Sequence, residues 1–261
     1  MSDIAATEST LETVARLAPR RRSFTALLEA AAGLLRLVVI AVFVVGFIAQ
    51  PLMIPSESME QSLLPGDFVL VDRVVYSPAG LWRYLLPYGN VHRGDVVVFR
   101  SPLKQGDYMV KRVIGLPGDH LQIQDSDVYI NGDMLHEPYH YDQPDTDDPF
   151  PAGFPAKEYP GPAVDPRWWN QLQHLSSNGE LIIPDGKYFV MGDNRNRSRD
   201  SRFWGLVDRK SIVARPLIVY LSLRQGDSVD DPSDDRLSNK GGRNSSHAAA
   251  VRAERFFLLV H

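Results

Sequence analysis

Residues Leu52–Arg73 read LMIPSESMEQSLLPGDFVLVDR, and the second half of this stretch is typical of a β-strand. A Gly-Asp turn at Gly66 is followed directly by an apolar, β-branched run, which favours an extended backbone. The first half instead places two hydroxyls, on Ser56 and Ser58, behind Pro55, where the chain leaves a long apolar segment. The stretch therefore joins a strand signal to a candidate reactive turn.

The pairing of a glycine turn with an apolar run recurs along the chain. It returns as HRGDVVVFRSP (92–102), LPGDHLQIQ (116–124) and PDGKYFVMGDN (184–194). Residues 128–135 read VYINGDML, in which Asn-Gly fits the type I′ turn of a β-hairpin. Residues 209–223 supply another strand, and helical periodicity is poor outside the N-terminal region. We expect a mainly β fold, an antiparallel sheet or barrel.

The alternating pattern stops between positions 135 and 183, where Pro, Asp and Gly accumulate. We expect residues 135–183 to form a small inserted subdomain or loop region within a main β domain made of residues 55–134 and 184–261. The acidic part of the insertion could hold calcium, but a solvated loop fits its composition better. Residues 225–250 predict a flexible loop, after which residues 251–261 return as an edge strand or lie on a membrane surface.

The segment before the reactive turn has the composition of a membrane anchor. Residues 37–55 (LVVIAVFVVGFIAQPLMIP) contain no charged side chain and, extended backwards, are long enough for a helix to cross a bilayer core of ~30 Å. Several arginines precede the run: Arg16, Arg20, Arg21, Arg22 and Arg36. The positive-inside rule then predicts cytoplasmic residues 1–30, a signal anchor over residues 31–54 that ends at Pro51 and Pro55, and an extracytoplasmic remainder.

Two other interpretations of the apolar run compete with the anchor. A cleavable signal peptide would need a small-x-small exit site, which is at best half matched here. A buried core helix is disfavoured by the arginine cluster. A second apolar stretch, LWRYLLPYG (81–89), could dip into the outer leaflet or belong to the core.

Composition excludes several classes of protein. The net charge is −4, from 28 basic and 32 acidic residues, without a basic stripe for nucleic acid. The chain has no cysteine, which rules out disulfides, thiolate metal sites and a cysteine nucleophile. Among the histidines only His136 and His140 have ligand-like spacing, and Pro138 between them disrupts the helix that would align them. We predict neither a metal nor a cofactor.

A Ser-His-Asp triad has no local signature in the sequence, and the G-x-S-x-G motif is absent; serine can instead be activated by a neutral lysine. A lysine base must lose its proton near neutral pH, which apolar surroundings favour. Lys111 fits, since it lies in the apolar strand sequence YMVKRVIG. Simpler explanations exist for each signal. Ser58 could cap a helix in a capping box with Gln61, Lys111 could be solvated, and residues 192–205 could be only a polar turn.

Four segments together resemble type I signal peptidases, the membrane-bound serine-lysine endopeptidases that remove signal peptides from exported proteins. They are IPSESMEQSLLPGDFVLV (54–71), RGDVVVF (93–99), DYMVKRVIGLPGD (107–119) and MGDNRNRSRDSRFWGLV (191–207), in this order after the anchor. The resemblance implies a largely antiparallel β structure with an inserted second subdomain. It also implies secretory preproteins as substrates, a location in the inner membrane facing the periplasm or exterior, and catalysis without a cofactor.

Carried over by position, the resemblance implies Ser58 as nucleophile and Lys111 as general base. Ser198 would orient the lysine amine, and Ser56 would join the Ser58 N–H in an oxyanion hole. The supporting ion pairs would be Asp200 with Arg202 and Asp193 with Arg112. Small side chains are preferred by the family at the first and third positions before the cut. The candidates for lining those pockets are Ile54, Pro55, Met59 and Tyr108.

One residue departs from the family's pattern. The position between the two serines is commonly Gly, and here it is Glu57. A carboxylate that pointed inward would disfavour the oxyanion, so we expect Glu57 to point to solvent. Two alternatives remain beside the general processing enzyme: a maturation protease dedicated to one secreted substrate, and an inactive relative that serves as a membrane-anchored binding module.

Overall fold

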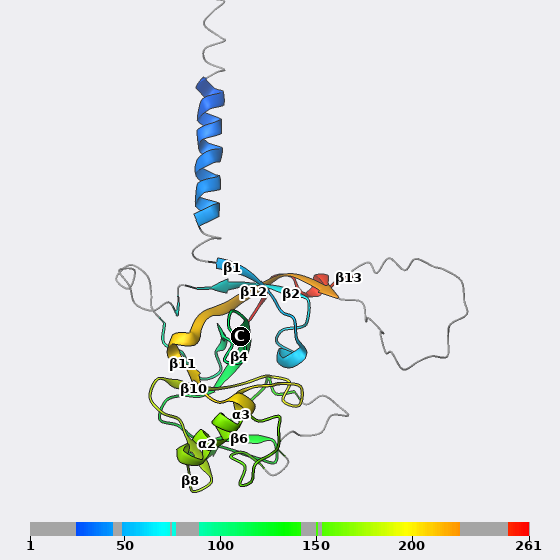
Figure 1. Ribbon diagram of the computed structural model, residues 1–261. Helices are drawn as coiled ribbons and strands as arrows, with labels where there is room; N and C mark the ends of the chain where they lie inside the picture. Colours follow the sequence, from blue (N-terminus) through cyan, green and yellow to red (C-terminus); the bar gives the residue numbers. More distant parts are fainter. Residues whose placement is uncertain are drawn as a thin grey trace, which may run out of the picture. The chain divides into compact units, whose positions relative to one another are not determined.

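The computed structural model describes residues 25–43, 49–73, 75–76, 89–141, 150, 153–224 and 250–260 (Figure 1). The chain divides into two units, Met1–Ile48 and Ala49–His261. The described part of the first unit is one helix, and the second unit contains the β structure. Most of the LWRYLLPYG stretch (81–88), residues 225–249 and most of the acidic part of the expected insertion lie outside the described residues.

The N-terminal unit contains a helix from Thr25 to Phe43 that is long and apolar enough to cross a membrane. Its large apolar side chains are about half exposed or more, from 48% for Val38 to 67% for Leu27. An apolar helix of this length near the N-terminus fits a membrane-anchoring segment. The helix begins before position 31, where the sequence placed the anchor's start.

The end of the expected anchor is corrected by strand β1 (Ala49–Met53), which pairs with β2 (Asp67–Asp72). Hydropathy alone did not separate this strand from the preceding helix, because both segments are apolar. Pro51 lies opposite Leu70 and does not end a helix. β1 is the edge strand of its sheet, and an edge is where a strand tolerates a proline without a ladder N–H.

The main sheet of the second unit is antiparallel, as expected. Its order is β1-β2-β12-β3-β4-β10-β11, and the long strand β12 connects the two halves. The remaining strands have these bounds: β3 Val96–Arg100, β4 Tyr108–Gly115, β10 Lys187–Met191, β11 Val207–Asp208 and β12 Ile212–Arg224. β12 pairs with β2 along one half and with β3 along the other, with register shifts in both ladders. These irregularities let one strand serve both halves of the sheet.

A second, five-stranded sheet has the order β7-β6-β5-β9-β8. Its strands are β5 His120–Gln124, β6 Asp127–Ile130, β7 Asp133–Met134, β8 Ser176–Ser177 and β9 Glu180–Ile182. This sheet already begins at His120, before the expected boundary at position 135. The insertion needs strands from both sides of that boundary, since Leu121 on β5 pairs with Leu181 on β9.

Helix α2 (Pro166–Leu175) lies within residues 135–183, the expected inserted subdomain or loop region. The Asp165 side chain caps the helix by accepting hydrogen bonds from the backbone N–H groups of Arg167 and Trp168. Proline at the first helical position is pre-organised for the helical φ. Trp168 and Leu172 bury one face of the helix, four residues apart.

The two sheets share one hydrophobic core. Phe189 on β10 is fully buried and packs against the ring of Phe154 with centroids 5.3 Å apart. Leu121 of the small sheet belongs to the same cluster. A second cluster lies under β1, β2 and β12 and includes Ile54, Met59 and Val219. The small sheet is thus an extension of the main core and does not bury a core of its own.

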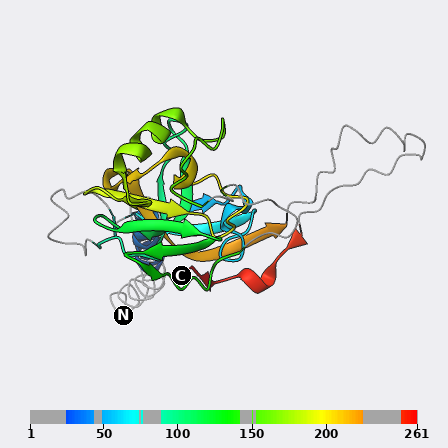
Figure 2. The ribbon, with the colours of Figure 1, turned by 90° about the horizontal axis from the view of Figure 1, so that it is seen from below.

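The described C-terminal residues run along β12 (Figure 2). β13 (Ala250–Val251) and β14 (Leu258–Leu259) both pair antiparallel with β12, and the 3-10 turn η5 (Ala253–Arg255) lies between them. We call residues 250–260 the C-terminal strap. Of the two alternatives for this region, an added strand is therefore the one seen in the structure.

Candidate active site

The turn that carries Ser58 is short and held at both ends. Ser58 lies in the 3-10 turn η2 (Glu57–Met59) and is 6% exposed. The base of the turn is closed by two backbone hydrogen bonds, from Ile54 N–H to the Asp67 carbonyl (2.8 Å) and from Gly66 N–H to the Ile54 carbonyl (2.9 Å). Met59 is buried in the second core cluster and fixes the turn to the sheet.

The turn is not the start of a longer helix, so the capping-box interpretation of Ser58 is wrong. Ser58 lies within η2, and Gln61 has a positive φ of 83°. The Ser56 hydroxyl caps no backbone N–H and lies 3.2 Å from the Ser58 hydroxyl. Both hydroxyls are therefore available for chemistry at the same point.

Lys111 meets Ser58 from strand β4. It is opposite Val97 on β3 and only 3% exposed, so the solvated-lysine interpretation is wrong. The Lys111 Nζ is hydrogen-bonded to the Ser58 Oγ. Burial lowers the pKa of Lys111 to about 8, because the charged ammonium loses its hydration; Asp200 and Asp193 oppose this shift, and Arg202 adds to it. A substantial fraction of the amine is thus neutral near pH 8.

The segment after β10 forms the other wall of the site. Asp200 is fully buried and caps the short helix α3 (Ser201–Trp204). Arg202 pairs with its carboxylate through Nε and Nη2, both at 2.9 Å. Burial alone would raise the pKa of Asp200, but the charge and hydrogen bonds of Arg202 lower it below its usual value. The Gly192 N–H also donates to this carboxylate, at 3.1 Å.

Ser198 lies in this loop with a buried hydroxyl. The residue is 4% exposed, and its Oγ has no hydrogen-bond partner among the described residues. Gly192 makes room for it, because a Cβ there would lie 2.3 Å from both the Ser198 Oγ and the Ser58 carbonyl oxygen. A glycine is therefore required where the loop passes the turn that carries Ser58.

A second buried ion pair supports the strand that carries the lysine. Arg112 binds the Asp193 carboxylate with Nε and Nη2, each at 2.8 Å. The Ser62 hydroxyl joins the pair by donating to Asp193 (2.5 Å) and accepting from Arg112 (2.9 Å). Ser62 lies in the quoted stretch but was not singled out. Its role depends on a residue far along the chain, which no local pattern indicates.

Glu57, the residue that departs from the family's pattern, is exposed as expected. Its carboxylate is 3.0 Å from the Nη1 of Arg197, and both side chains are about half exposed. The neighbouring Glu60 accepts a hydrogen bond from the Asn194 amide, at 3.2 Å. Two acidic residues of the nucleophile turn thus contact the loop that carries Ser198, and the negative charge of Glu57 is paired.

The four candidate pocket residues fall into two groups. Pro55 and Tyr108 are exposed, so a peptide can touch them. Ile54 and Met59 are 2% and 1% exposed and form part of the second core cluster. Ile54 and Met59 therefore pack beneath the surface that a peptide could touch. Their side chains could contact a peptide only if the turn that carries Ser58 opened.

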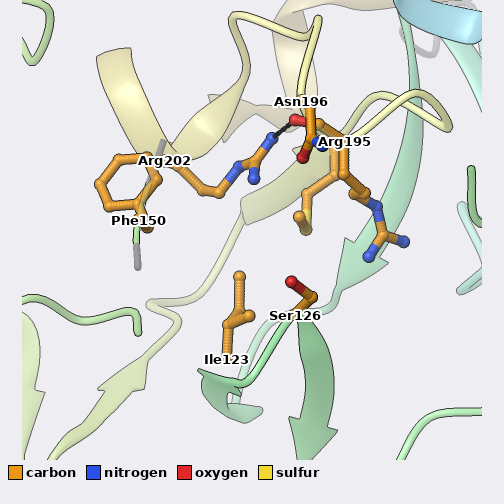
Figure 3. Close-up of a pocket in the computed structure, with 7 residues that line it drawn as sticks. Ile123, Ser126, Phe150, Arg195, Asn196 and Arg202 are labelled. Carbon is orange, nitrogen blue, oxygen red and sulfur yellow. Dashed lines mark hydrogen bonds between the residues drawn. The ribbon is translucent and has the colours of Figure 1, made fainter. Parts of the chain in front are cut away.

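Arg195 is a buried residue of the same loop that is not among the candidate site residues. It pairs with Glu137, the residue between the two histidines that had been weighed as metal ligands. Its carbonyl accepts from Arg202 at 2.6 Å, while its Nη1 has no partner among the described residues. Arg195 and Arg202 line a cavity of about 10 Å³, whose other lining residues are Ile123, Ser126, Phe150, Met191 and Asn196. Figure 3 shows the side chains of Arg195, Arg202 and Phe150 at this cavity. This volume suits about one water molecule.

A serine hydroxyl bonded to a buried lysine amine, beside a second hydroxyl, is the arrangement expected of a serine hydrolase whose base is lysine. Comparison with known proteins agrees with this class. The family model described as signal peptidase, peptidase S26, matches residues 27–221. The chain therefore belongs to the signal peptidase family S26, serine-type peptidases that cleave signal peptides with a serine-lysine dyad.

Individual relatives carry the same description. Signal peptidase I of Pseudomonas aeruginosa is 34% identical over 191 residues, which cover 67% of this chain and 66% of the relative. Signal peptidase IB of Staphylococcus aureus is 38% identical over 179 residues, 67% of this chain and 80% of the relative. The match to the crystal structure of a signal peptidase I from Enterococcus faecalis has 32% sequence identity and a TM-score of 0.33. It covers 48% of this chain and 96% of the chain in that structure.

Proposed function

We propose that this chain cleaves signal peptides from secretory preproteins with Ser58 as nucleophile and Lys111 as general base. The observation that carries the proposal is the hydrogen bond between the Ser58 Oγ and the buried Lys111 Nζ, whose pKa is lowered to about 8 by burial. A neutral amine can accept the serine proton, whereas a solvated lysine would remain charged at neutral pH.

The reaction proceeds in two acyl-transfer steps. Ser58 gives its proton to Lys111 and attacks the scissile carbonyl, and the oxyanion receives hydrogen bonds from the Ser56 hydroxyl and the Ser58 N–H. The Lys111 ammonium then protonates the leaving amine, so the mature protein departs and the signal peptide stays as an ester on Ser58. Lys111 next takes a proton from water, whose hydroxide attacks the ester, and the ammonium returns that proton to Ser58.

The surrounding residues are proposed to hold the dyad in place. Asp200 and Arg202 fix the loop on which Ser198 lies. The buried Ser198 hydroxyl, which has no hydrogen-bond partner among the described residues, would orient the lysine amine in the working enzyme. Asp193 and Arg112 brace strand β4 next to Lys111. Pro55 and Tyr108 are the exposed candidates for contacting the substrate.

The placement of the enzyme is part of the proposal. The helix Thr25–Phe43 would anchor it in the inner membrane, with the arginine-rich N-terminal residues in the cytoplasm and the β unit outside. Protease protection of the β unit in inside-out and right-side-out vesicles tests this orientation.

The direct test is cleavage of a purified preprotein, in detergent, by the intact chain and by Ser58→Ala and Lys111→Ala. We expect a mature product of the correct size from the intact chain and none from either variant. Lys104→Ala is the matched control, because Lys104 is a highly exposed lysine that pairs with Asp107 at the surface. Equal cleavage by Lys111→Ala would refute the base assignment, and no cleavage of several preproteins by the intact chain would refute the activity.

A further inference from the structure

The C-terminal strap reaches the base of the nucleophile turn, although it lies outside the residues that the family model matches (27–221). Its side chains come close to the turn through Arg252 and Arg255. These arginines follow β13, and β13 and β14 hold the strap on β12 at either end. Backbone pairing with the main sheet therefore holds both ends of the strap, in addition to the contacts of its side chains with the turn.

Arg255 binds two groups of the turn at once. Its Nη2 lies 2.7 Å from the Asp67 Oδ2 and 3.0 Å from the Ser62 carbonyl oxygen, and its Nε is 3.1 and 3.2 Å from the two Asp67 oxygens. Asp67 is 0% exposed and also accepts from the Leu64 N–H, at 2.8 Å. A carboxylate at such depth needs a cationic partner, because an unpaired buried charge is strongly destabilising.

Arg252 adds a weaker contact at the same place. Its Nη1 donates to the Pro65 carbonyl and to the Ser222 hydroxyl, both at 3.1 Å, and lies 3.8 Å from an Asp67 oxygen. Arg252 therefore holds the end of the turn against β12, while Arg255 makes the shorter contacts with the Asp67 carboxylate. Without Arg255, the cationic partner left to the Asp67 carboxylate among the described residues would be the more distant Arg252.

The contacts of Arg255 continue from the turn to the catalytic lysine. Ser62, whose carbonyl Arg255 holds, uses its hydroxyl to bind Arg112 and Asp193. Arg112 is the neighbour of Lys111 on β4. On the other side, the Leu63 N–H donates to the Met59 carbonyl, directly beside Ser58. The strap is thus joined by short polar contacts to both sides of the dyad.

We propose that Arg255 is a positioning residue for catalysis, which keeps the turn Ile54–Asp67 in the register that aligns Ser58 with Lys111. The inference rests on the proposed function of this dyad. It makes the C-terminal strap part of the catalytic unit. Since a misplacement of about 1 Å can reduce a rate by about 10²-fold, loss of this support should lower kcat more than it weakens substrate binding.

The test compares Arg255→Ala and Arg255→Lys with the intact chain on one preprotein. Both kcat and KM are measured well below each variant's thermal midpoint, together with the rate at which a β-lactam-type agent acylates Ser58. We expect Arg255→Ala to lower kcat and the acylation rate by about 10- to 100-fold with KM changed less than about threefold. Arg255→Lys should recover part of this loss, because it keeps the charge but cannot span Asp67 and Ser62 equally well.

Two further variants keep the test decisive. Arg224→Ala is the control, since Arg224 is exposed on β12 and β13 pairs with it through the backbone; its kcat should stay unchanged. Ser62→Ala preserves the Arg255–Asp67 pair and removes only the hydroxyl that leads to Arg112, so it should lower kcat even if Arg255→Ala does not fold. Unchanged kcat in folded Arg255→Ala, or in both Arg255→Lys and Ser62→Ala, overturns the inference. An inactive intact chain would instead refute the function.

Discussion

The ε-amine of Lys111 can accept a proton from Ser58 only when the amine is neutral. Its pKa is lowered to about 8 because burial removes hydration from the charged form. We therefore expect kcat/KM to rise with pH through an apparent pKa of about 8 and to approach a plateau above it. A pH profile of preprotein cleavage measures this. A profile that falls between pH 7 and 9 would contradict a lysine base.

The same burial should cost stability. The pKa of Lys111 falls from 10.5 to about 8 on folding, so the unfolded chain holds more protons between these values. The cost is complete below pH 8 and disappears as the pH approaches 10.5. Lys111→Met should raise the free energy of unfolding at pH 7 by up to about 3 kcal/mol, and the gain should shrink at pH 10. Denaturant titration at both pH values checks this, and a gain independent of pH would contradict it.

Glu57 places a carboxylate beside the nucleophile, and Arg197 pairs with it at 3.0 Å. We expect Arg197→Ala to lower kcat by a few-fold, because the unpaired carboxylate then opposes the oxyanion. In a Glu57→Gly background the same change should have little effect. A double-mutant cycle at low and high salt measures the coupling. Additive effects of the two changes would show that Arg197 does not compensate Glu57.

At the scale of elements, most long strands were predictable from the sequence, whereas strand β1 and the boundary of the small sheet were not. The alternating or continuous apolar pattern in residues 67–72, 96–100, 120–124 and 187–191 is local, so each strand appears in the structure. The Asn131-Gly132 turn also forms, with positive φ at both residues. β1 was hidden by its apolar neighbours, since hydropathy cannot separate an edge strand from the end of a helix. The boundary of the small sheet depends on the β5–β9 pairing, which no local pattern contains.

Helix α2 was missed although its start signals are present in the sequence. Asp165 accepts from the Arg167 N–H at 2.7 Å and Pro166 occupies the first helical position, but the surrounding prolines favour loop. We expect Asp165→Ala to lower the free energy of unfolding by about 1 kcal/mol and to leave kcat unchanged. Urea titration measures the first quantity. Asp165→Ser should keep most of the stability, and an equal loss in both variants would contradict a capping role.

In the candidate site too, residues in local sequence motifs were predictable, whereas contacts between residues far apart in the chain were not. Ser58 and Lys111 are in motifs that can be read from the chain, and the structure brings them together. Arg255 gives no such signal, because its partner Asp67 lies 188 residues away along the chain. Long-range pairing of this kind follows from the course of β12 through the sheet and not from residue type or spacing.

At the scale of the whole molecule, the C-terminal strap has to stay paired with β12 if Arg255 is to reach Asp67. The ladder pairs Arg224 with Ala250 and Leu223 with Val251, so residues 225–249 leave and return at one place. We expect a chain in which Asn-Gly replaces residues 225–249 to keep kcat and KM within about twofold, because a type I′ turn can join paired strands. Preprotein cleavage by this variant is the measurement. A loss like that of Arg255→Ala would show that the strap had detached.

The pairing of Arg224 with Ala250 also gives the enzyme a permissive position for engineering. A folded cargo domain whose own ends lie close together could be spliced between these two residues, as domain insertions generally succeed where the chain departs from and rejoins the same spot. The inserted domain would then be attached at the same β12–β13 ladder that positions Arg255. Its release by an added protease and any loss of peptidase activity could be measured separately in one molecule.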